Sequence, residues 1–307
     1  MLHKIRGFHI GAMFLLVLLL ASFLLPLVSS EPAINLFQYN TDERHLEMPP
    51  YSPSFDHWLG TDRNGKDLLY ALIEGSKYTI IFAFIITFAR ILISLLFGLF
   101  LKRIFMNSWF NGLMQGFQYI PQSLFSLLVL SPLLIYELRA ESHYTYSETL
   151  IIQLIVLIGA GIFPLTKIIT DTSETLSHTE YVICSKHMGA SAFQITIRHI
   201  LPHLVPRLFV LSGRQFTTVL TLMLHLSLYH VFIGGVKITS GQEHDQFSSY
   251  TTPSNEWTGL ISMNHRELML EPFVVLVPVL AYALLILFVN SMAKNLEKNS
   301  AKRTLPQ

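Results

Sequence analysis

Residues 171–203 read DTSETLSHTEYVICSKHMGASAFQITIRHILPH, and this polar stretch separates two long apolar segments of the chain. Capping-box spacing occurs twice in it, first at Ser177 and Glu180 and then at Ser191 and Gln194. A hydroxyl followed three residues later by Glu or Gln satisfies two free N–H groups at the start of a helix. The stretch therefore predicts two short helices. Between two membrane-spanning segments, such a pair predicts a docking surface for a protein in the water.

Gly189 and Pro202 set the expected limits of these two helices. Four residues of the first helix fall at i, i+3, i+4 and i+7, and so on one face: Tyr181, Cys184, Ser185 and Met188. Gly189 follows them and suits the left-handed residue that ends a helix, so we expect a hinge there. Pro202 lacks an N–H group and is expected to limit the second helix.

The same stretch resembles the cytoplasmic "EAA" loop of ABC importer permeases, most closely the variant found in dipeptide, oligopeptide and nickel importers. Three segments carry the resemblance: Glu180-Tyr181-Val182, Gly189-Ala190-Ser191 and Arg198-His199-Ile200-Leu201-Pro202. Where the family has Glu-Ala-Ala, this chain has Ile183-Cys184-Ser185, so the two small residues are kept and the acid is absent. The alternative is an ordinary interhelical loop with two good caps.

In that family the loop is the coupling helix, which sits in a groove of the ATPase subunit. The resemblance implies that this contact is made by the following residues: Glu180, Tyr181, Cys184, Ser185, Gly189, Ala190, Ser191, Leu201 and Pro202. It also implies a second homologous permease subunit, two ABC ATPase subunits and an extracytoplasmic substrate-binding protein as partners, besides the lipid bilayer. Neither nucleic acid nor a cofactor is expected.

A second family motif lies at residues 57–67. There HWLGTDRNGKD resembles the pattern HxLGTDxxGRD of C-type permeases of peptide and nickel importers, with Lys66 at the arginine position. The matching residues of its central part are Leu59, Gly60, Thr61, Asp62, Gly65 and Asp67. The spacing of Gly60, Gly65 and Lys66 is nearly that of a phosphate-binding loop, but such a loop needs Ser or Thr where Asp67 stands. The ATP-hydrolysing subunit is therefore expected to be another chain.

The composition predicts a membrane protein. The 307 residues are 51% hydrophobic and 13% charged, whereas a soluble domain carries about 25% charged residues. Six apolar segments approach or exceed the roughly 20 residues that cross a bilayer: 8–28, 79–101, 109–138, 150–170, 204–233 and 272–292. The predicted fold is an all-α polytopic membrane protein with six transmembrane helices, and the resemblance implies the type I ABC importer permease fold. The single cysteine, Cys184, excludes an internal disulfide.

The first apolar segment has an alternative interpretation as a secretory signal, with a cleavage site at Val28-x-Ser30. Its length exceeds the roughly 7–15 apolar residues of a signal core, which favours an uncleaved span. The chain then divides into a tail with the first span (1–28), an extracytoplasmic segment (29–77), a five-helix core (78–292) and a C-terminal tail (293–307).

Positively charged residues predict the orientation. Ten Lys and Arg residues lie in the N-terminal tail, residues 102–108, residues 171–203 and the C-terminal tail, while the short opposite loop 138–148 has Arg139 alone. Because short loops rich in Lys and Arg stay in the cytoplasm, we expect a multi-pass protein of the cell membrane with both termini and residues 171–203 in the cytoplasm.

Polar residues inside the predicted spans are candidates for a translocation path: Arg90, Gln118, Arg214 and His225. A charge at mid-span costs about 2.5–3.5 kcal/mol even on a lenient insertion scale, so it normally faces a cavity or a partner. Two interpretations of Arg90 and Arg214 stay open. Each pairs with a carbonyl or with an acid of the second permease, or both line the path and attract a peptide carboxylate.

No enzyme is predicted, because motifs such as GxSxG and HExxH do not occur in the sequence. His199 and His203 are four residues apart, but Pro202 lies between them, so no metal site is predicted either. The expected function is that of a permease subunit of an ATP-driven importer for peptides. Import of nickel or another small solute by the same fold is the first alternative, and a membrane protein without an ATPase partner is the second.

Overall fold

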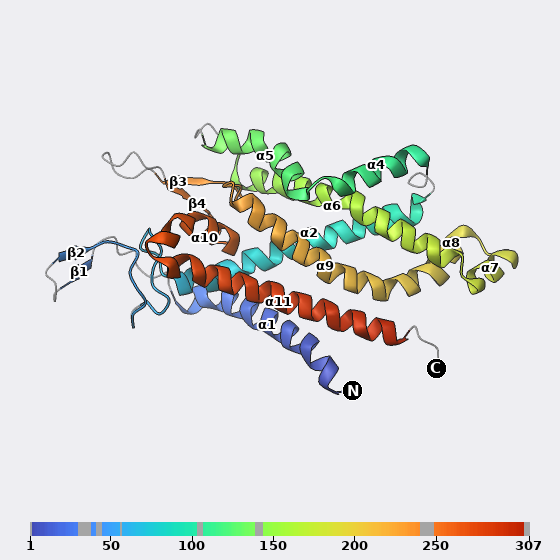
Figure 1. Cartoon of the computed structure of the whole chain (residues 1–307), viewed down its shortest axis with the longest axis horizontal. Coiled ribbons are helices and arrows are strands. Elements are labelled where there is room, and N and C mark those ends of the chain that lie inside the picture. Colours follow the sequence, from blue (N-terminus) through green and yellow to red (C-terminus); the bar gives the residue numbers. More distant parts are fainter. Residues whose placement is uncertain are drawn as a thin grey trace.

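The computed structural model describes residues 2–29, 38–40, 45–55, 57–102, 107–138, 144–239 and 249–303. These residues form an elongated helical bundle (Figure 1). Its long helices are α1 (Leu2–Val28), α2 (Leu68–Phe100), α6 (Tyr146–Ser177), α9 (Leu201–Ser227) and α11 (Pro272–Arg303). Shorter helices are α4 (Ser108–Tyr119), α5 (Gln122–Leu138), α7 (Glu180–His187), α8 (Ala192–Ile195), α10 (Trp257–Asn264), the π-helix η1 (Thr196–Ile200) and the 3₁₀-helix η2 (His265–Met269).

Two small antiparallel hairpins lie at one end of the bundle (Figure 1). Their strands are β1 (Gln38–Asn40) with β2 (His45–Glu47) and β3 (Lys237–Thr239) with β4 (Ser249–Thr251). The all-α prediction is therefore right for the bundle but missed these hairpins. Strands of three residues in polar loops are too short to show the period-two pattern that identifies a strand in a sequence.

Within the described residues, four helices are long and apolar enough to cross a membrane, over Phe8–Val28, Leu68–Phe100, Tyr146–Ser177 and Pro272–Lys298. The pair α4 and α5, bent by 89° at the break between them, is either a fifth, broken span or a re-entrant loop. The remaining predicted span corresponds to α9, which has 27 residues but is not apolar enough to be counted with the others. Length and composition thus support four or five of the six predicted spans, and α9 as a span stays a prediction.

Local capping moves two helix limits away from the predicted ones. Helix α2 begins at Leu68 instead of 79, because the Asp67 carboxylate accepts a hydrogen bond of 2.9 Å from the Tyr70 backbone N–H. Helix α6 begins at a capping box formed by Thr145 and Glu148. The span predicted over 109–138 is interrupted at Ile120 and Pro121, where the missing N–H group of proline ends the helical ladder.

Helices α1 and α11 lie side by side and run in opposite directions (Figure 1). The rings of Phe14 and Phe288 stack with centroids 4.3 Å apart. Gly11 lies so close to Met292 that a Cβ atom at Gly11 would be 2.5 Å from the methionine Cγ. The apolar parts of the two helices therefore cover the same layer. The 21 apolar residues of α1 span about 31 Å, which matches the roughly 30 Å hydrocarbon core of a bilayer.

A hydrophobic core runs through the middle of the bundle. Helices α2, α6, α9, α10 and α11 contribute fully buried side chains to it, including Ile86, Leu220, Leu260 and Leu285. The Tyr282 hydroxyl donates a hydrogen bond of 2.7 Å to the Leu220 carbonyl and so joins α11 to α9. Helix α9 is thus packed at the centre of the fold, although its composition is more polar than that of its neighbours.

The two ends of the bundle differ. Helices α7 and α8, the start of α1 and the end of α11 lie toward one end, which we call the α7 end, and the hairpins and α10 lie at the α10 end (Figure 1). One end of the bundle therefore contains the beginning of α1, the end of α11 and the 171–203 region. Six crossings of a membrane would put these three parts on the same side. Which end faces the cytoplasm stays a prediction from the charges.

Candidate functional site

Residues 178–200, the connecting segment, join α6 to α9 at the α7 end. The first predicted capping box, from Ser177 to Glu180, is wrong. Helix α6 continues through Ser177, whose hydroxyl donates a hydrogen bond of 2.7 Å to the Glu174 carbonyl, and Thr179 is the N-terminal cap residue of α7. The Ser177 side chain is therefore used inside the preceding helix.

The second capping box and the glycine turn are confirmed. The Gln194 backbone N–H donates to Ser191 Oγ at 3.3 Å, and the Ser191 N–H donates to Gln194 Oε1 at 3.1 Å. Gly189 has φ of +88°, in the left-handed region, and a Cβ atom there would meet no atom of the described residues within 4 Å. Gly189 is thus required by backbone conformation alone.

One side of α7 is buried against the bundle. Val182 and Ser185 point inward, and the Ser185 hydroxyl donates a hydrogen bond of 2.8 Å to the Tyr181 carbonyl. Val182 belongs to a small cluster made by α2, α6, α7, α8, η1 and α9, whose other members are Leu99, Leu165, Ile169, Leu176, Ile195, Ile200 and Leu204. The prediction that Ser185 shares one face with Tyr181, Cys184 and Met188 is wrong, because those three side chains are exposed.

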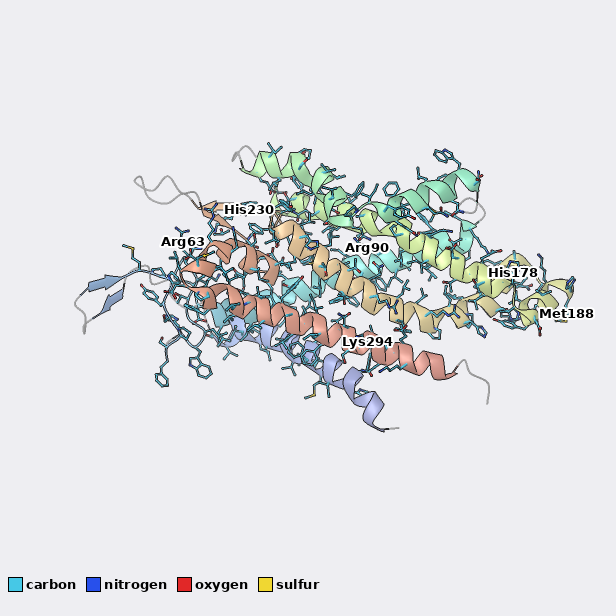
Figure 2. The ribbon with its side chains drawn as sticks, in the orientation of Figure 1. Arg63, Arg90, His178, Met188, His230 and Lys294 are labelled. Atoms are coloured by element: carbon cyan, nitrogen blue, oxygen red, sulfur yellow. The ribbon has the colours of Figure 1, made fainter. Side chains whose placement is uncertain are left out.

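The other side of the segment exposes large apolar side chains. They are Ile183, Met188, Phe193 and Ile197, and Met188 is 82% exposed. Met188 lies at the tip of the bundle (Figure 2). Glu180 and Ser191 are also exposed, and Ala190 is half-buried against the inner cluster. Such a patch beside polar residues is typical of a protein–protein contact.

The connecting segment is joined to α9 without a break. Helices α8, η1 and α9 follow one another directly, and the Leu201 N–H donates to the Thr196 carbonyl in the π-helical pattern. The prediction that Pro202 limits the second helix is wrong, because the helix continues from η1 through Pro202 into α9. The rings of Tyr181 and His203 stack with centroids 5.2 Å apart, so α7 touches the first turn of α9.

Arg90 lies inside the bundle and is fully buried (Figure 2). Its Nε donates to the Leu157 carbonyl at 3.0 Å, and its Nη1 donates to Gln122 Oε1 at 3.2 Å. A Cβ atom at Gly161 would be 2.4 Å from the guanidinium carbon, so α6 needs a glycine at that position. Arg90 therefore links α2 to α6 and to the start of α5. A carbonyl of this chain is its partner, in line with the structural interpretation.

Arg214 is largely exposed and pairs with Glu297 of α11 at 2.9 Å. The neighbouring Gly213 lies against Ala293, where the apolar part of α11 ends. Arg214 thus sits at the edge of the apolar layer rather than in its middle. Gln118 and His225 are exposed as well, on α4 and α9.

Helix α9 carries a polar stripe that the sequence analysis did not identify as one feature. The stripe consists of exposed residues separated by 7, 4 and 7 positions: Arg207, Arg214, Thr218 and His225. These steps return to the same side of a helix with 3.6 residues per turn. The spacing was readable in the sequence and would have added Arg207 and Thr218 to the candidates. It also accounts for the polar composition of α9.

The motif at residues 57–67 forms a closed loop at the α10 end. Asp62 is buried and accepts hydrogen bonds from the backbone N–H groups of Asn64 and Lys66 at 2.9 and 2.8 Å. Burial raises the pKa of Asp62, while these bonds act in the opposite direction. These two N–H groups, which a phosphate-binding loop would offer to its ligand, are directed at the loop's own carboxylate.

Other motif residues tie this loop to its surroundings. Thr61 Oγ1 accepts a hydrogen bond of 2.8 Å from the Tyr51 N–H, and Asp67 contacts His57 Nδ1 at 3.0 Å. Gly60 and Gly65 both have left-handed φ angles, +75° and +76°. Leu59 packs against the central core. The motif is therefore a structural feature that fixes the start of α2.

Three oxygen-bearing side chains from separate elements hold the loop that follows α9. Ile233 N–H donates to Glu256 Oε1 at 3.2 Å, and Gly234 N–H donates to Gln153 Oε1 at 2.9 Å. Glu137 lies next to Gly235, close enough that a Cβ atom there would be 2.7 Å from its Oε1. These residues were missed because their partners are far away in the sequence. The signal available in the sequence was an acid directly before Trp257.

Comparison with known proteins identifies the family. The sequence profile described as "Binding-protein-dependent transport system inner membrane component" matches residues 94–302. The chain belongs to this family. The match covers the connecting segment, α9 and α11, and it confirms the resemblance that the 171–203 stretch carries.

Among curated relatives of this family member are a putative peptide transport system permease protein of Brucella suis biovar 1 and the oligopeptide transport system permease protein OppC of Mycobacterium bovis. The first is 23% identical over 205 residues, 67% of this chain and 62% of the relative. The second is 22% identical over 191 residues, 62% of each chain. The matched part spans less than two thirds of the relatives' own length. Family membership and the apolar helices make this chain an integral membrane protein of the transport permease type.

Proposed function

We propose that the chain is a permease subunit of an ATP-driven ABC importer and that the connecting segment is its contact with a separate ATPase subunit. The observation that carries this proposal is the structure of that segment. Met188 and Phe193 are exposed on a folded, capped surface, while Tyr181 of the same segment stacks on His203 in the first turn of α9. A movement of a partner bound to the exposed face would therefore be transmitted directly to α9, a central helix of the bundle.

The polar stripe on α9 is our candidate for one wall of the translocation path. Polar side chains on a spanning helix face a cavity or a partner, because lipid cannot satisfy them. Arg214, Thr218 and His225 stand on the exposed side of α9, opposite its buried residues. A second homologous permease would supply the facing wall. Gln118 on α4 is a further candidate, and Arg90 would then support the wall from behind.

A peptide substrate is proposed from the relatives and from this chemistry. Both relatives are named as peptide or oligopeptide permeases. Arg214, and His225 when protonated, would attract the C-terminal carboxylate of a peptide. An extracytoplasmic binding protein would deliver the peptide at the α10 end, which the charges predict to lie outside the cytoplasm.

The test is recovery of the ATPase together with uptake of a labelled peptide. The chain is co-expressed with the second permease and the ATPase subunits of the proposed importer, and the ATPase is recovered by pull-down. Met188→Asp and Phe193→Asp should each lower recovery at least tenfold, since loss of a central apolar contact costs about 2 kcal/mol. Met188→Leu is the matched control and should keep both recovery and uptake.

Full recovery of the ATPase with both aspartate variants would contradict the proposed contact. The substrate class is tested separately, by uptake of a peptide, of its C-terminal amide and of Ni²⁺. We expect uptake of the free peptide and weaker uptake of the amide. Uptake of Ni²⁺ without uptake of the peptide would replace the peptide by the metal ion as substrate.

A further inference from the structure

An apolar rim lies at the α10 end, near the start of α11. It consists of exposed side chains from the loop of residues 51–67 and from η2 with the residue after it: Phe55, Trp58, Leu268, Met269 and Leu270. Phe55 is fully exposed and Met269 is 93% exposed. Exposed apolar groups of this size at the surface of one region need a partner, because water is a poor environment for them.

The rim is held in place by the folded loops that carry it. In the first loop, the N–H groups of Ser54 and Gly60 both donate to the His57 carbonyl, at 2.8 and 2.9 Å. Gly60 lies against the ring of Phe273 in the first turn of α11, where a Cβ atom would be 2.5 Å from Cε2. Arg63 pairs with Glu267 of η2 at 3.6 Å, which joins the two loops.

The depth of the rim follows from the pairing of α1 with α11. Met292 lies beside Gly11, and the apolar part of α1 ends at Val28. Counted from this contact at 1.5 Å per residue, Val28 and Pro272 lie about 26 and 30 Å away, so they reach the same level to within about one helical turn. Phe273 touches Gly60 at that level. The rim therefore lies where the hydrocarbon layer meets the headgroups.

We propose that the rim is inserted into the headgroup boundary of the bilayer leaflet at the α10 end and anchors the loop of residues 51–67 on the membrane surface. The occupant of this surface is phospholipid, because the rim lies at the level where α1 ends with the exposed apolar side chains of Leu27 and Val28. Aromatic residues favour this depth. The exposed Arg63 and Arg266 stand beside the apolar groups, where they can meet lipid phosphates (Arg63 is labelled in Figure 2).

Tryptophan fluorescence tests this inference, and the measurement does not depend on transport activity. The chain has three tryptophans, Trp58, Trp109 and Trp257, of which Trp257 is buried in the core. The complete chain with Trp109→Phe is placed in vesicles of phosphatidylcholine and phosphatidylglycerol. Trp58→Phe in the same background is the matched control, and the difference between the two emission signals belongs to Trp58.

We expect lipids brominated near the headgroup to remove most of the Trp58 emission, and lipids brominated deep in the acyl chain to remove less. Acrylamide in the water should quench Trp58 weakly. Strong quenching by acrylamide with no effect of brominated lipid would overturn the proposal and assign the rim to a soluble protein partner. Emission insensitive to both quenchers would also overturn it, because the rim would then be covered by another protein chain.

Discussion

The two ends of the bundle differ in how their polar and apolar groups find partners. At the α10 end, buried polar groups find partners within the chain: Asp62 accepts two backbone N–H groups, and Glu256 accepts bonds from Thr252, Ser254 and Ile233. At the α7 end, large apolar side chains such as Met188 and Phe193 remain exposed on the connecting segment, and the apolar rim of the α10 end differs from them in that we propose lipid as its partner. The first arrangement stabilises this chain by itself, and the second leaves a surface that another protein can cover.

Because of this difference, we expect substitutions in the two regions to affect different properties, stability in the first and partner binding in the second. Substitutions in the polar network at the α10 end should unfold the protein, because unsatisfied buried polar groups are costly. Substitutions on the outer face of the connecting segment should leave the fold intact and change only what binds there.

The largest expected effect on stability is that of Glu256→Ala. It leaves the Thr252 and Ser254 hydroxyls and the Ile233 N–H without their buried acceptor, and each unsatisfied group costs about 1–3 kcal/mol. We expect a loss of roughly 3 kcal/mol or more, measured as a lower Tm in detergent. Glu256→Gln keeps an acceptor oxygen and should lose much less. A wild-type Tm for Glu256→Ala would show that the network does not hold this end together.

The pH dependence of stability is a second test of the contribution of Glu256. Burial raises the pKa of Glu256 above its ordinary value of 4.5, against the opposing hydrogen bonds from Ser254 and Thr252. The folded state therefore prefers the protonated acid, so its contribution to stability is fully present below pH 4.5 and is lost as the pH rises through the raised pKa. We expect the Tm of Glu256→Gln minus that of the wild type to increase over this pH range. A difference that does not change with pH would contradict the raised pKa.

A smaller effect is expected for Arg90→Ala in the middle of the bundle. This variant removes the hydrogen bonds to Leu157 and Gln122 and leaves a cavity beside Gly161, which should cost roughly 1–3 kcal/mol. The Tm of Arg90→Lys should lie between those of Arg90→Ala and the wild type, because an ammonium group cannot reproduce the planar guanidinium contacts. Both variants should still recover the ATPase in a pull-down. Loss of that recovery at an unchanged Tm would mean that Arg90 acts on the α7 end.

The smallest effect on stability is expected for Arg214→Ala. Its ion pair with Glu297 is exposed on both sides, and exposed pairs contribute about 0–1 kcal/mol. If Arg214 lines the path, peptide uptake should fall although the Tm hardly changes. Thr172→Ala, a substitution at a half-buried position on α6, is a control for a polar change elsewhere at this end. Unchanged uptake with Arg214→Ala would remove this residue from the proposed path.

Local chemistry decided which features could be predicted from the sequence. The left-handed Gly189, the Ser191 capping box and the apolar parts of α1 and α11 depend on neighbouring residues or on length, and they were predicted correctly. The end of α6 at Ser177 and the continuation of the helix through Pro202 were not, because a serine and a proline each fit two positions relative to a helix end.

Long-range contacts account for the rest. The partner of Arg90 is a carbonyl 67 residues away, and that of Gly234 is a side chain 81 residues away. No periodicity in the sequence identifies such pairs, since they depend on how the helices pack. The polar stripe of α9 is a different case, because its spacing of 7, 4 and 7 residues was readable before the structure.

Gly189→Val tests the central claim that the connecting segment couples a partner to α9. A β-branched residue is strained at φ of +88°, and no neighbouring atom would be displaced by the added Cβ, so the change should misplace α7 without disturbing the bundle. Gly112→Val, where a Cβ atom also meets nothing within 4 Å and φ is not left-handed, is the matched control.

The measurement is recovery of the ATPase with Gly189→Val, alongside membrane level and peptide uptake. For Gly189→Val we expect a normal membrane level, loss of ATPase recovery and loss of uptake. The Gly112→Val control should retain more ATPase recovery and more uptake. Full ATPase recovery and full uptake with Gly189→Val would contradict the claim, because the turn between α7 and α8 would then have no part in coupling.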